Sequence, residues 1–319
     1  MAITTTLFSR LRLPPQVGFA SSSHTSHLLT ERGRLVDFLT LMKPRVMSLA
    51  VFTAFVGLII APGHLDSVHG SIAILAIAAG AGAAGVLNMW YEADIDGLMT
   101  RTARRPLPRG KVSRAEALAF GLVLGGGAVA VLGLALNVTA AALLAFAIFF
   151  YAVVYTVWLK RRTPQNIVIG GAAGALPPVI GWVAATGNIG LEPVILFLII
   201  FLWTPPHFWA LAILKRDEYA RAGVPMLPVV ASERSTALQI LAYTVLLAAV
   251  SLIPVATGLL GFLYAAVAVL LGIRFIWLAR RLLVTHSPLA ARATFLFSLL
   301  YLALLFAAMG ADRVLASTL

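Results

Sequence analysis

Three polar side chains at helical spacing form the first pattern in this chain that could do chemistry. Asn88, Glu92 and Asp96 recur every four residues in the run Asn-Met-Trp-Tyr-Glu-Ala-Asp-Ile-Asp. On a helix they fall within roughly 80° of one another, as a stripe about 12 Å long, and Asp94 points away from it. Two carboxylates and a carboxamide repel one another unless a hard cation lies between them. The stripe therefore predicts catalytic residues that hold Mg2+ bridged to a diphosphate.

A basic run follows the stripe within one short loop. Guanidinium groups bind phosphate oxygens through paired hydrogen bonds, so this loop could neutralise a diphosphate. Anchoring of the loop at a membrane surface explains any single arginine equally well. The run comprises Arg101, Arg104, Arg105, Arg109 and Lys111.

A second polar cluster lies further along the chain, after the Pro205-Pro206 pair. The two prolines predict a break or kink in the helix that contains them. Asp217 is a further catalytic candidate, and Lys215 and Arg216 are candidate diphosphate ligands. We expect this cluster and the first to converge over one cavity.

His207 is the one histidine inside a predicted span. It could bind a ligand, or it could hydrogen-bond a carbonyl freed by the neighbouring prolines, and the sequence favours neither.

The elements that position these residues must be membrane helices. The chain has 319 residues, of which 61% are hydrophobic and 11% charged, and apolar runs of about 20 residues recur along it. Such runs do not alternate as barrel strands do, so the fold class is all-α. The absence of cysteine excludes disulfide and cysteine-based metal sites. The net charge of +12 follows the loops, which excludes nucleic acid as a partner.

The sequence predicts a polytopic bundle of nine spans. All of the 24 Lys and Arg residues except Arg313 fall on one side of this map, which predicts a cytoplasmic N-terminus and an external C-terminus. Residues 1–38 are expected to form a disordered cytoplasmic tail, with a mitochondrial transit peptide as the alternative. Residues 39–319 are expected to form one transmembrane domain. The predicted spans are 46–62, 71–95, 115–136, 138–158, 166–186, 191–214, 235–257, 259–280 and 292–310.

These residues resemble the UbiA-type intramembrane prenyltransferases and, within them, the heme O synthases. The resemblance covers nearly the whole chain after about residue 38. Its motifs are Leu-Met-Lys-Pro-Arg-Val at 41–46, the stripe at 88–96, Thr-Pro-Gln-Asn at 163–166, Trp-Thr-Pro-Pro-His-Phe-Trp at 203–209 and Ala-Gly-Val-Pro-Met-Leu-Pro at 222–228.

The resemblance implies transfer of the farnesyl group of farnesyl diphosphate to a vinyl group of heme b, with water added, to give heme O for terminal oxidases. Mg2+ would assist, and heme b would be a substrate. Arg101, Arg105, Lys160, Lys215 and Arg216 would neutralise the departing diphosphate, and His207 would be the candidate heme-binding residue. Membrane lipid and a downstream heme-modifying enzyme are the further partners. The implied location is a bacterial inner membrane, with the mitochondrial inner membrane as the alternative.

Two positions depart from the wider superfamily. Glu92 stands where aspartate is usual, and Asp217 and Glu218 are adjacent where quinone-type members have spaced aspartates, so Asp217 ranks below Asn88 and Asp96. A quinone-precursor or chlorophyll-type acceptor is the alternative within the class. A transporter is the rival from another class, although we find no internal repeat of the transporter kind.

Overall fold

The computed structural model describes residues 33–318, except residues 64 and 101, and this part of the chain is helical with no strand. The all-α prediction is therefore confirmed. A short helix, Gly33–Leu41, comes first, so the expected tail boundary at residue 38 falls inside a helix; the rest of that tail lies outside the described residues. The elements that follow are α2 (Pro44–Ile60), α3 (Ser67–Tyr91), α4 (Ala93–Asp96), α5 (Arg114–Ala135), α6 (Val138–Phe149), η1 (Phe150–Leu159), α7 (Asn166–Thr186), α8 (Leu191–Leu214), α9 (Arg216–Arg221), α10 (Leu227–Val230), α11 (Glu233–Val250), α12 (Ile253–Ala256), α13 (Phe262–Thr285) and α14 (Pro288–Thr318).

Eight of the described helices are long and apolar enough to cross a membrane, or nine if a bent pair counts as one span. That pair is Gly33–Leu41 with α2, which meet at 55°. Lys43 and Pro44 lie at the bend because the residue before a proline is disfavoured in the α conformation. Counting the pair as one span gives the nine spans expected from the sequence.

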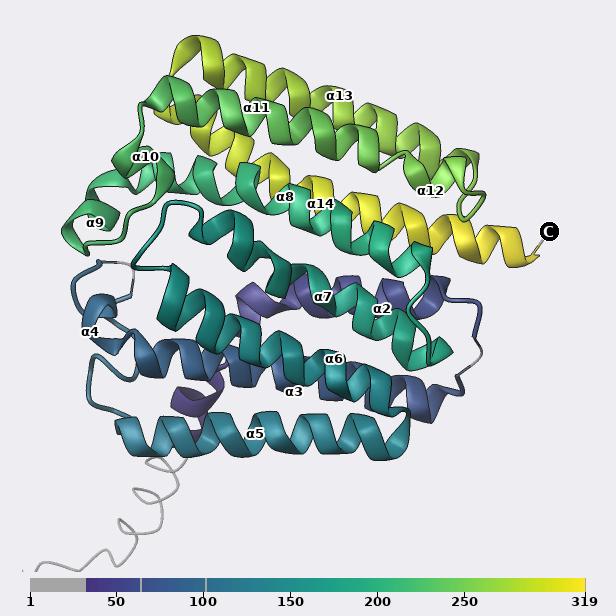
Figure 1. Cartoon of the computed structure of the whole chain (residues 1–319), viewed down its shortest axis with the longest axis horizontal. Coiled ribbons are helices and arrows are strands. Elements are labelled where there is room, and N and C mark those ends of the chain that lie inside the picture. Colours follow the sequence, from purple (N-terminus) through teal and green to yellow (C-terminus); the bar gives the residue numbers. More distant parts are fainter. Residues whose placement is uncertain (1–32, 64, 101, 319) are drawn as a thin grey trace, which may run out of the picture.

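The long helices lie side by side, and their connections alternate between the two ends of the bundle (Figure 1). The α3–α5, η1–α7, α8–α11 and α13–α14 connections gather at one end, which we call the cation-rich end because these loops carry most of the lysines and arginines. The described C-terminal residues lie at the other end. The stripe and the second polar cluster therefore share one end, as predicted.

Two tight turns connect neighbouring helices at the other end of the bundle (Figure 1). Asn137 caps α6 by accepting the backbone N–H of Ala140, and its side-chain amide donates to the carbonyls of Val183 and Ala184 on α7. Gly258, at φ 73°, turns the chain between α12 and α13. Glycine is needed there because other residues rarely adopt a positive φ.

One break in a helix was not predicted from the sequence, and another that the sequence allowed for does not occur. The second span does not run unbroken through the stripe, because Glu92 lies between α3 and α4 at φ −92° and ψ 10°. Conversely, Pro205 and Pro206 do not break α8, which is continuous from Leu191 to Leu214. The φ angle of proline fits a helix, but each proline removes a backbone hydrogen bond. Both prolines are buried, so packing around α8 can offset that loss.

Candidate active site

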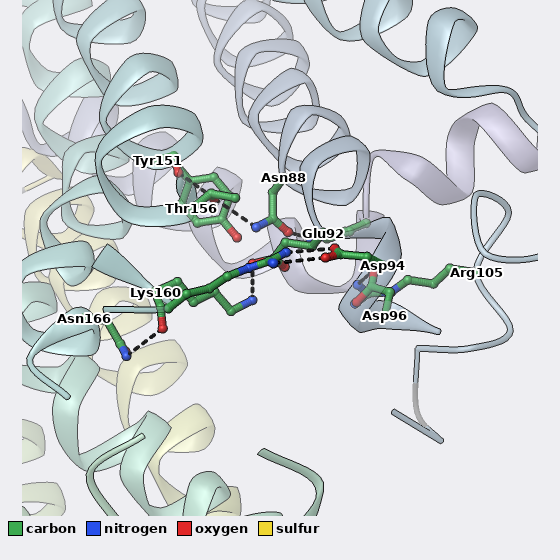
Figure 2. Close-up of polar contacts among 11 residues, drawn as sticks. Asn88, Glu92, Asp94, Asp96, Arg105, Tyr151, Thr156, Lys160 and Asn166 are labelled. Carbon is green, nitrogen blue, oxygen red and sulfur yellow. Dashed lines mark hydrogen bonds and ion pairs between the residues drawn. The ribbon is translucent and has the colours of Figure 1, made fainter. Parts of the chain in front are cut away.

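Asn88, Glu92 and Asp96 keep a common face although the helix is interrupted between α3 and α4. The backbone N–H of Glu92 donates to the Asn88 carbonyl, and that of Asp96 donates to the Glu92 carbonyl, so the helical register continues across the break. The side chains of Asn88, Glu92 and Asp96 point into the protein, and the residues are 2, 2 and 3% exposed. In Figure 2, Asn88 lies next to Thr156, Glu92 next to Lys160 and Asp96 next to Arg105. The stripe does not face lipid.

Each member of the stripe contacts a different cation. Lys43 Nζ donates to Asn88 Oδ1 at 2.5 Å. Lys160 pairs with Glu92, and Arg105 Nη1 pairs with Asp96 Oδ2 at 2.6 Å (Figure 2). Buried carboxylates need such partners because an uncompensated charge is costly away from water. The site is therefore a row of alternating negative and positive groups, in which both signs are available to a ligand.

Lys43 is a site residue that the sequence analysis did not assign. Its backbone lies in the left-handed region, at φ 56° and ψ 52°, which is uncommon for a residue other than glycine. The bend between Gly33–Leu41 and α2 holds it there, and this directs the ammonium group to Asn88. Strain of this kind gathers at functional sites. The signal in the sequence was the Lys-Pro pair, since proline restricts the residue before it.

A π-helical segment, η1, forms the wall opposite Asn88. Thr156, which is fully buried, donates its hydroxyl hydrogen to the Tyr151 carbonyl at 2.7 Å, five residues earlier. The same oxygen accepts from Asn88 Nδ2 at 3.0 Å. Such segments are rare and occur often at functional sites. Here the wider turn sets Thr156 to fix the orientation of the Asn88 amide.

The end of η1 is anchored by a second asparagine. Asn166, fully buried at the start of α7, donates to the carbonyls of Lys160 and Thr163 at 3.3 and 2.7 Å. Because Lys160 pairs with Glu92, Asn166 holds the backbone from which that lysine reaches the stripe (Figure 2).

Asp94 lies apart from the stripe, as predicted. Its two oxygens accept from the Arg161 guanidinium at 2.8 and 3.0 Å, and its side chain is 55% exposed. The hydrogen bonds from Arg161 hold the pKa of Asp94 below its usual value. The pair ties α4 to the chain that follows η1.

The second polar cluster exposes one of its two adjacent carboxylates and buries the other. Asp217 is exposed, whereas its neighbour Glu218 is largely buried and accepts from Lys215 Nζ at 2.7 Å. Arg216 is exposed and lies 3.5 Å from Glu233. Glu218 is therefore the buried carboxylate of this loop, and no pattern in the sequence favoured it over Asp217. Arg101 lies outside the described residues.

The two clusters are held together by a shared apolar core. Ile95 and Met99, next to the stripe, belong to the same group of buried side chains as Tyr219 and Met226 in the second loop. Loops that are far apart in the sequence thus pack into one cap over the cation-rich end of the bundle (Figure 1).

Comparison with known proteins identifies the family. Residues 50–305 match the model described as the UbiA prenyltransferase family. The chain belongs to this family. It is 61% identical, over 284 residues, to a protein of Afipia carboxidovorans named protoheme IX farnesyltransferase, covering 88% of this chain and 91% of that protein. A protein of Rhizobium rhizogenes with the same name is 58% identical over 286 residues, covering 88% and 89%.

Solved structures share the UbiA fold. A structure described as that of digeranylgeranylglyceryl phosphate synthase in membranes has a TM-score of 0.75 at 20% identity, covering 88% of this chain and 99% of that one. A UbiA homolog from Archaeoglobus fulgidus, bound to GPP and Mg2+, has a TM-score of 0.60 at 17% identity, covering 86% and 99%.

The donor atoms of this UbiA chain fit Mg2+. Asn88 Oδ1 and the carboxylates of Glu92 and Asp96 are hard oxygen ligands, the kind that Mg2+ prefers. Glu92 Oε1 is buried and pairs with the Lys160 ammonium group, and a carboxylate oxygen with two lone pairs can hold a further ligand. In the part of the chain that the structure describes, no three side chains drawn from aspartate, glutamate, histidine and cysteine form a metal-binding group. The stripe has only two carboxylates, and its third donor is the amide oxygen of Asn88.

His207 lies deeper in the UbiA bundle than the stripe. It is 8% exposed, stacks on Trp203 at 4.3 Å between ring centroids, and contacts Phe295 at 4.9 Å. Its Nδ1 lies 2.7 Å from Ser298 Oγ, and that hydroxyl donates to the Phe295 carbonyl. The hydrogen-bond partner of His207 is therefore the Ser298 hydroxyl on α14. The sequence alone also allowed a carbonyl freed by the neighbouring prolines as the partner.

Proposed function

We propose that this chain transfers the farnesyl group of farnesyl diphosphate to a vinyl group of heme b, with addition of water, to give heme O for terminal oxidases. The observation that carries the proposal is the buried stripe, in which Asn88, Glu92 and Asp96 each contact a cation at the end of an apolar bundle. Relatives more than half identical over nearly nine-tenths of the chain bear the name of this activity, which supports the acceptor.

Asn88, Glu92 and Asp96 would hold Mg2+, which would supply positive charge against the diphosphate. Lys43, Lys160 and Arg105 contact these side chains now. In the substrate complex they are free to donate to diphosphate oxygens, since each can exchange a protein oxygen for a phosphate oxygen. Arg101, Lys215 and Arg216 would extend this positive surface, and Glu218 is a better second-loop candidate than Asp217.

Stabilisation of the leaving group is the main catalytic effect in this proposal. As the bond between farnesyl C1 and oxygen breaks, the diphosphate takes the electron pair, and fixed cations in a water-poor site stabilise it strongly. The allylic cation left behind lies with its chain among the apolar helices. A vinyl carbon of heme b attacks it, one water adds to the other vinyl carbon, and one proton is released.

His207 is the proposed heme-binding residue. Because Ser298 gives its only hydrogen to the Phe295 carbonyl, the ring hydrogen must reside on His207 Nδ1. Nε2 then keeps its lone pair, the state in which histidine binds iron. The stacked Trp203 and Phe295 rings surround the imidazole with flat apolar surfaces.

We also propose that the cation-rich end faces the cytoplasm of a bacterium and that the protein lies in its inner membrane. The positive-inside rule supports the orientation. The similar proteins named above come from bacteria. In this setting a downstream heme-modifying enzyme would receive heme O.

The test is incubation of membranes containing the protein with labelled farnesyl diphosphate, Mg2+ and heme b. Label in a porphyrin, separated by chromatography, is the expected result. Label in a quinone or chlorophyll-type lipid would favour the alternative acceptors, and uptake of intact label into vesicles would favour a transporter.

A further inference from the structure

A hollow at the cation-rich end lies outside the proposed active site, on the outer wall of the bundle. It has a volume of about 440 Å³ and lies between the start of α11 and the end of α13. Its lining combines two basic side chains with three apolar ones and no carboxylate. The lining residues are Arg234, Leu238, Leu283, Val284 and His286.

The basic side chains of this hollow are available to a ligand. Arg234 is exposed and makes no ion pair with any residue that the structure describes. The neighbouring carboxylate, Glu233, lies beside Arg216 instead. His286 ends α13 in the left-handed conformation, at φ 49°, and the backbone there is held by the bond from its N–H to the Leu282 carbonyl.

A row of basic and aromatic side chains continues from the hollow along α13. Arg281, Trp277 and Arg274 follow Val284 at intervals of three or four residues and are all exposed. The two guanidinium groups lie 5.7 and 4.3 Å from the centre of the Trp277 ring, one on each side along the helix. The hollow and this row of side chains form one surface, which we call the α13 surface.

Arg274 is the unusual member of the α13 surface. It lies about 16 Å from the end of α13, near the middle of a helix that is apolar enough to span a membrane. Its neighbours Leu270 and Ile273 are 69 and 63% exposed, so this side of the helix faces the lipid. A charge in that position is costly unless it finds a partner.

The part of the protein that the structure describes provides no negatively charged partner. No described carboxylate lies within ion-pair distance of Arg274. The Trp277 ring lies 4.3 Å from the Arg274 guanidinium, but the ring carries no net negative charge. The α13 surface therefore carries positive charge from the cation-rich end to the middle of the span, with no described carboxylate to oppose it.

We propose that the α13 surface binds an anionic phospholipid. Its phosphate lies between Arg234 and His286 in the hollow, and its acyl chains run along the exposed apolar residues of α11 and α13. Arg281, three residues from Val284, adds positive charge beside the hollow. Charge complementarity favours this occupant over a second copy of the chain, since the α13 surface has no carboxylate to oppose Arg274.

The first test counts bound lipids on the intact protein by native mass spectrometry. The protein is reconstituted in nanodiscs of phosphatidylcholine alone, or of phosphatidylcholine mixed with phosphatidylglycerol. We expect preferential retention of phosphatidylglycerol and about fivefold weaker binding in Arg234→Gln, as expected for loss of one basic group at a membrane surface. The matched control Arg221→Gln removes an exposed arginine at the same end, outside the hollow, and should retain the lipid.

The second test uses Trp277 as a reporter. Brominated phosphatidylglycerol should quench the protein fluorescence more than brominated phosphatidylcholine, and Trp277→Phe should remove this difference while leaving the other tryptophans in place. Equal quenching by the two lipids would overturn the proposal, as would unchanged lipid binding in Arg234→Gln.

Two further outcomes would assign the α13 surface to another occupant. Displacement of phosphatidylglycerol by soluble glycerol phosphate would make it a site for free phosphate. Dimers in nanodiscs of phosphatidylcholine alone that are lost in Trp277→Phe would make it an interface between copies of this chain. Either result overturns the lipid proposal.

Discussion

The amide of Asn88 and the hydroxyl of Thr156 form a bond whose direction is fixed. Thr156 gives its only hydrogen to the Tyr151 carbonyl, so its oxygen must accept from Asn88 Nδ2, at 3.0 Å. The Asn88 oxygen then has to face Lys43 and the proposed metal. The π-helical turn of η1 thus sets which end of a distant amide points into the site.

Replacing Thr156 with valine should test this relationship. Valine matches threonine in shape but cannot accept a hydrogen bond, so the amide is free to rotate. We expect turnover to fall about 10- to 100-fold, as for other residues that orient metal ligands, and the Mg2+ requirement to rise. The measurement is the rate of farnesyl transfer as a function of Mg2+ concentration.

Thr156→Ser is the matched control for that substitution. Serine keeps both hydrogen bonds, so its Mg2+ dependence should resemble that of the unchanged protein. If valine and serine gave the same Mg2+ dependence, the hydroxyl would have no orienting role.

A pair of identical substitutions separates the stripe from its surroundings. Asp96→Asn removes a buried carboxylate paired with Arg105, whereas Asp94→Asn removes a half-exposed one paired with Arg161. We expect Asp96→Asn to lower heme O formation at least about 100-fold, the scale for losing one group that stabilises developing charge. Asp94→Asn should retain most of the activity. Each variant is expressed in a heme-O-deficient strain, its level in the membrane is checked, and the hemes are separated by chromatography. Equal heme O formation by the two variants would remove the case for a metal at the stripe.

Lys43 should matter more than its exposed neighbour Arg45. Lys43→Met keeps the apolar part of the side chain but removes the ammonium group next to Asn88. We expect kcat/KM for farnesyl diphosphate to fall about 100-fold, because one donor to the leaving group is lost. Arg45→Gln removes a charge two residues away and should have little effect. Similar values for the two variants would show that Lys43 only anchors the helix.

His207 is tested through the two substrates separately. His207→Ala should raise the KM for heme b more than that for farnesyl diphosphate, because the residue lies in the bundle and does not contact the stripe. Ser298→Ala removes the partner of Nδ1 and should shift the absorption spectrum of bound heme without abolishing binding. Comparable changes in both KM values, with an unchanged heme spectrum in Ser298→Ala, would identify His207 as a packing residue.

The sequence could predict the long-range layout because hydrophobicity and charge decide it. Runs of apolar residues specify helices in lipid, and the loop cations place the stripe and the second cluster at one end. The four-residue spacing of Asn88, Glu92 and Asp96 also specified a shared face, which the backbone hydrogen bonds preserve across Glu92.

The partners of these residues could not be predicted, because they depend on packing between segments far apart in the sequence. Lys43 reaches Asn88 through a bend and a left-handed backbone, and Thr156 does so through a π-helical turn that hydrophobic periodicity does not reveal. Asp217 and Glu218 are adjacent and chemically alike, so only the fold of α9 decides which of them is buried. Similarly, the proline pair in α8 indicated a break, but packing keeps the helix intact.

The contact between α2 and α7 gives a prediction about stability. A Cβ at Gly181 would lie 2.0 Å from the Ala54 carbonyl oxygen, and one at Gly57 would lie 2.2 Å from the Pro178 carbonyl oxygen. Because backbone atoms are in the way, Gly181→Ala must push α2 away from α7, at a cost of about 1–3 kcal/mol. Gly174→Ala, in the same helix with no atom within 4 Å of the added Cβ, should be neutral or stabilising.

Since α2 begins directly after Lys43, Gly181→Ala should also weaken diphosphate use. Thermal unfolding in detergent and farnesyl transfer assays would measure both effects, and a midpoint for Gly181→Ala at or above that of Gly174→Ala would show that the helices can separate at no cost.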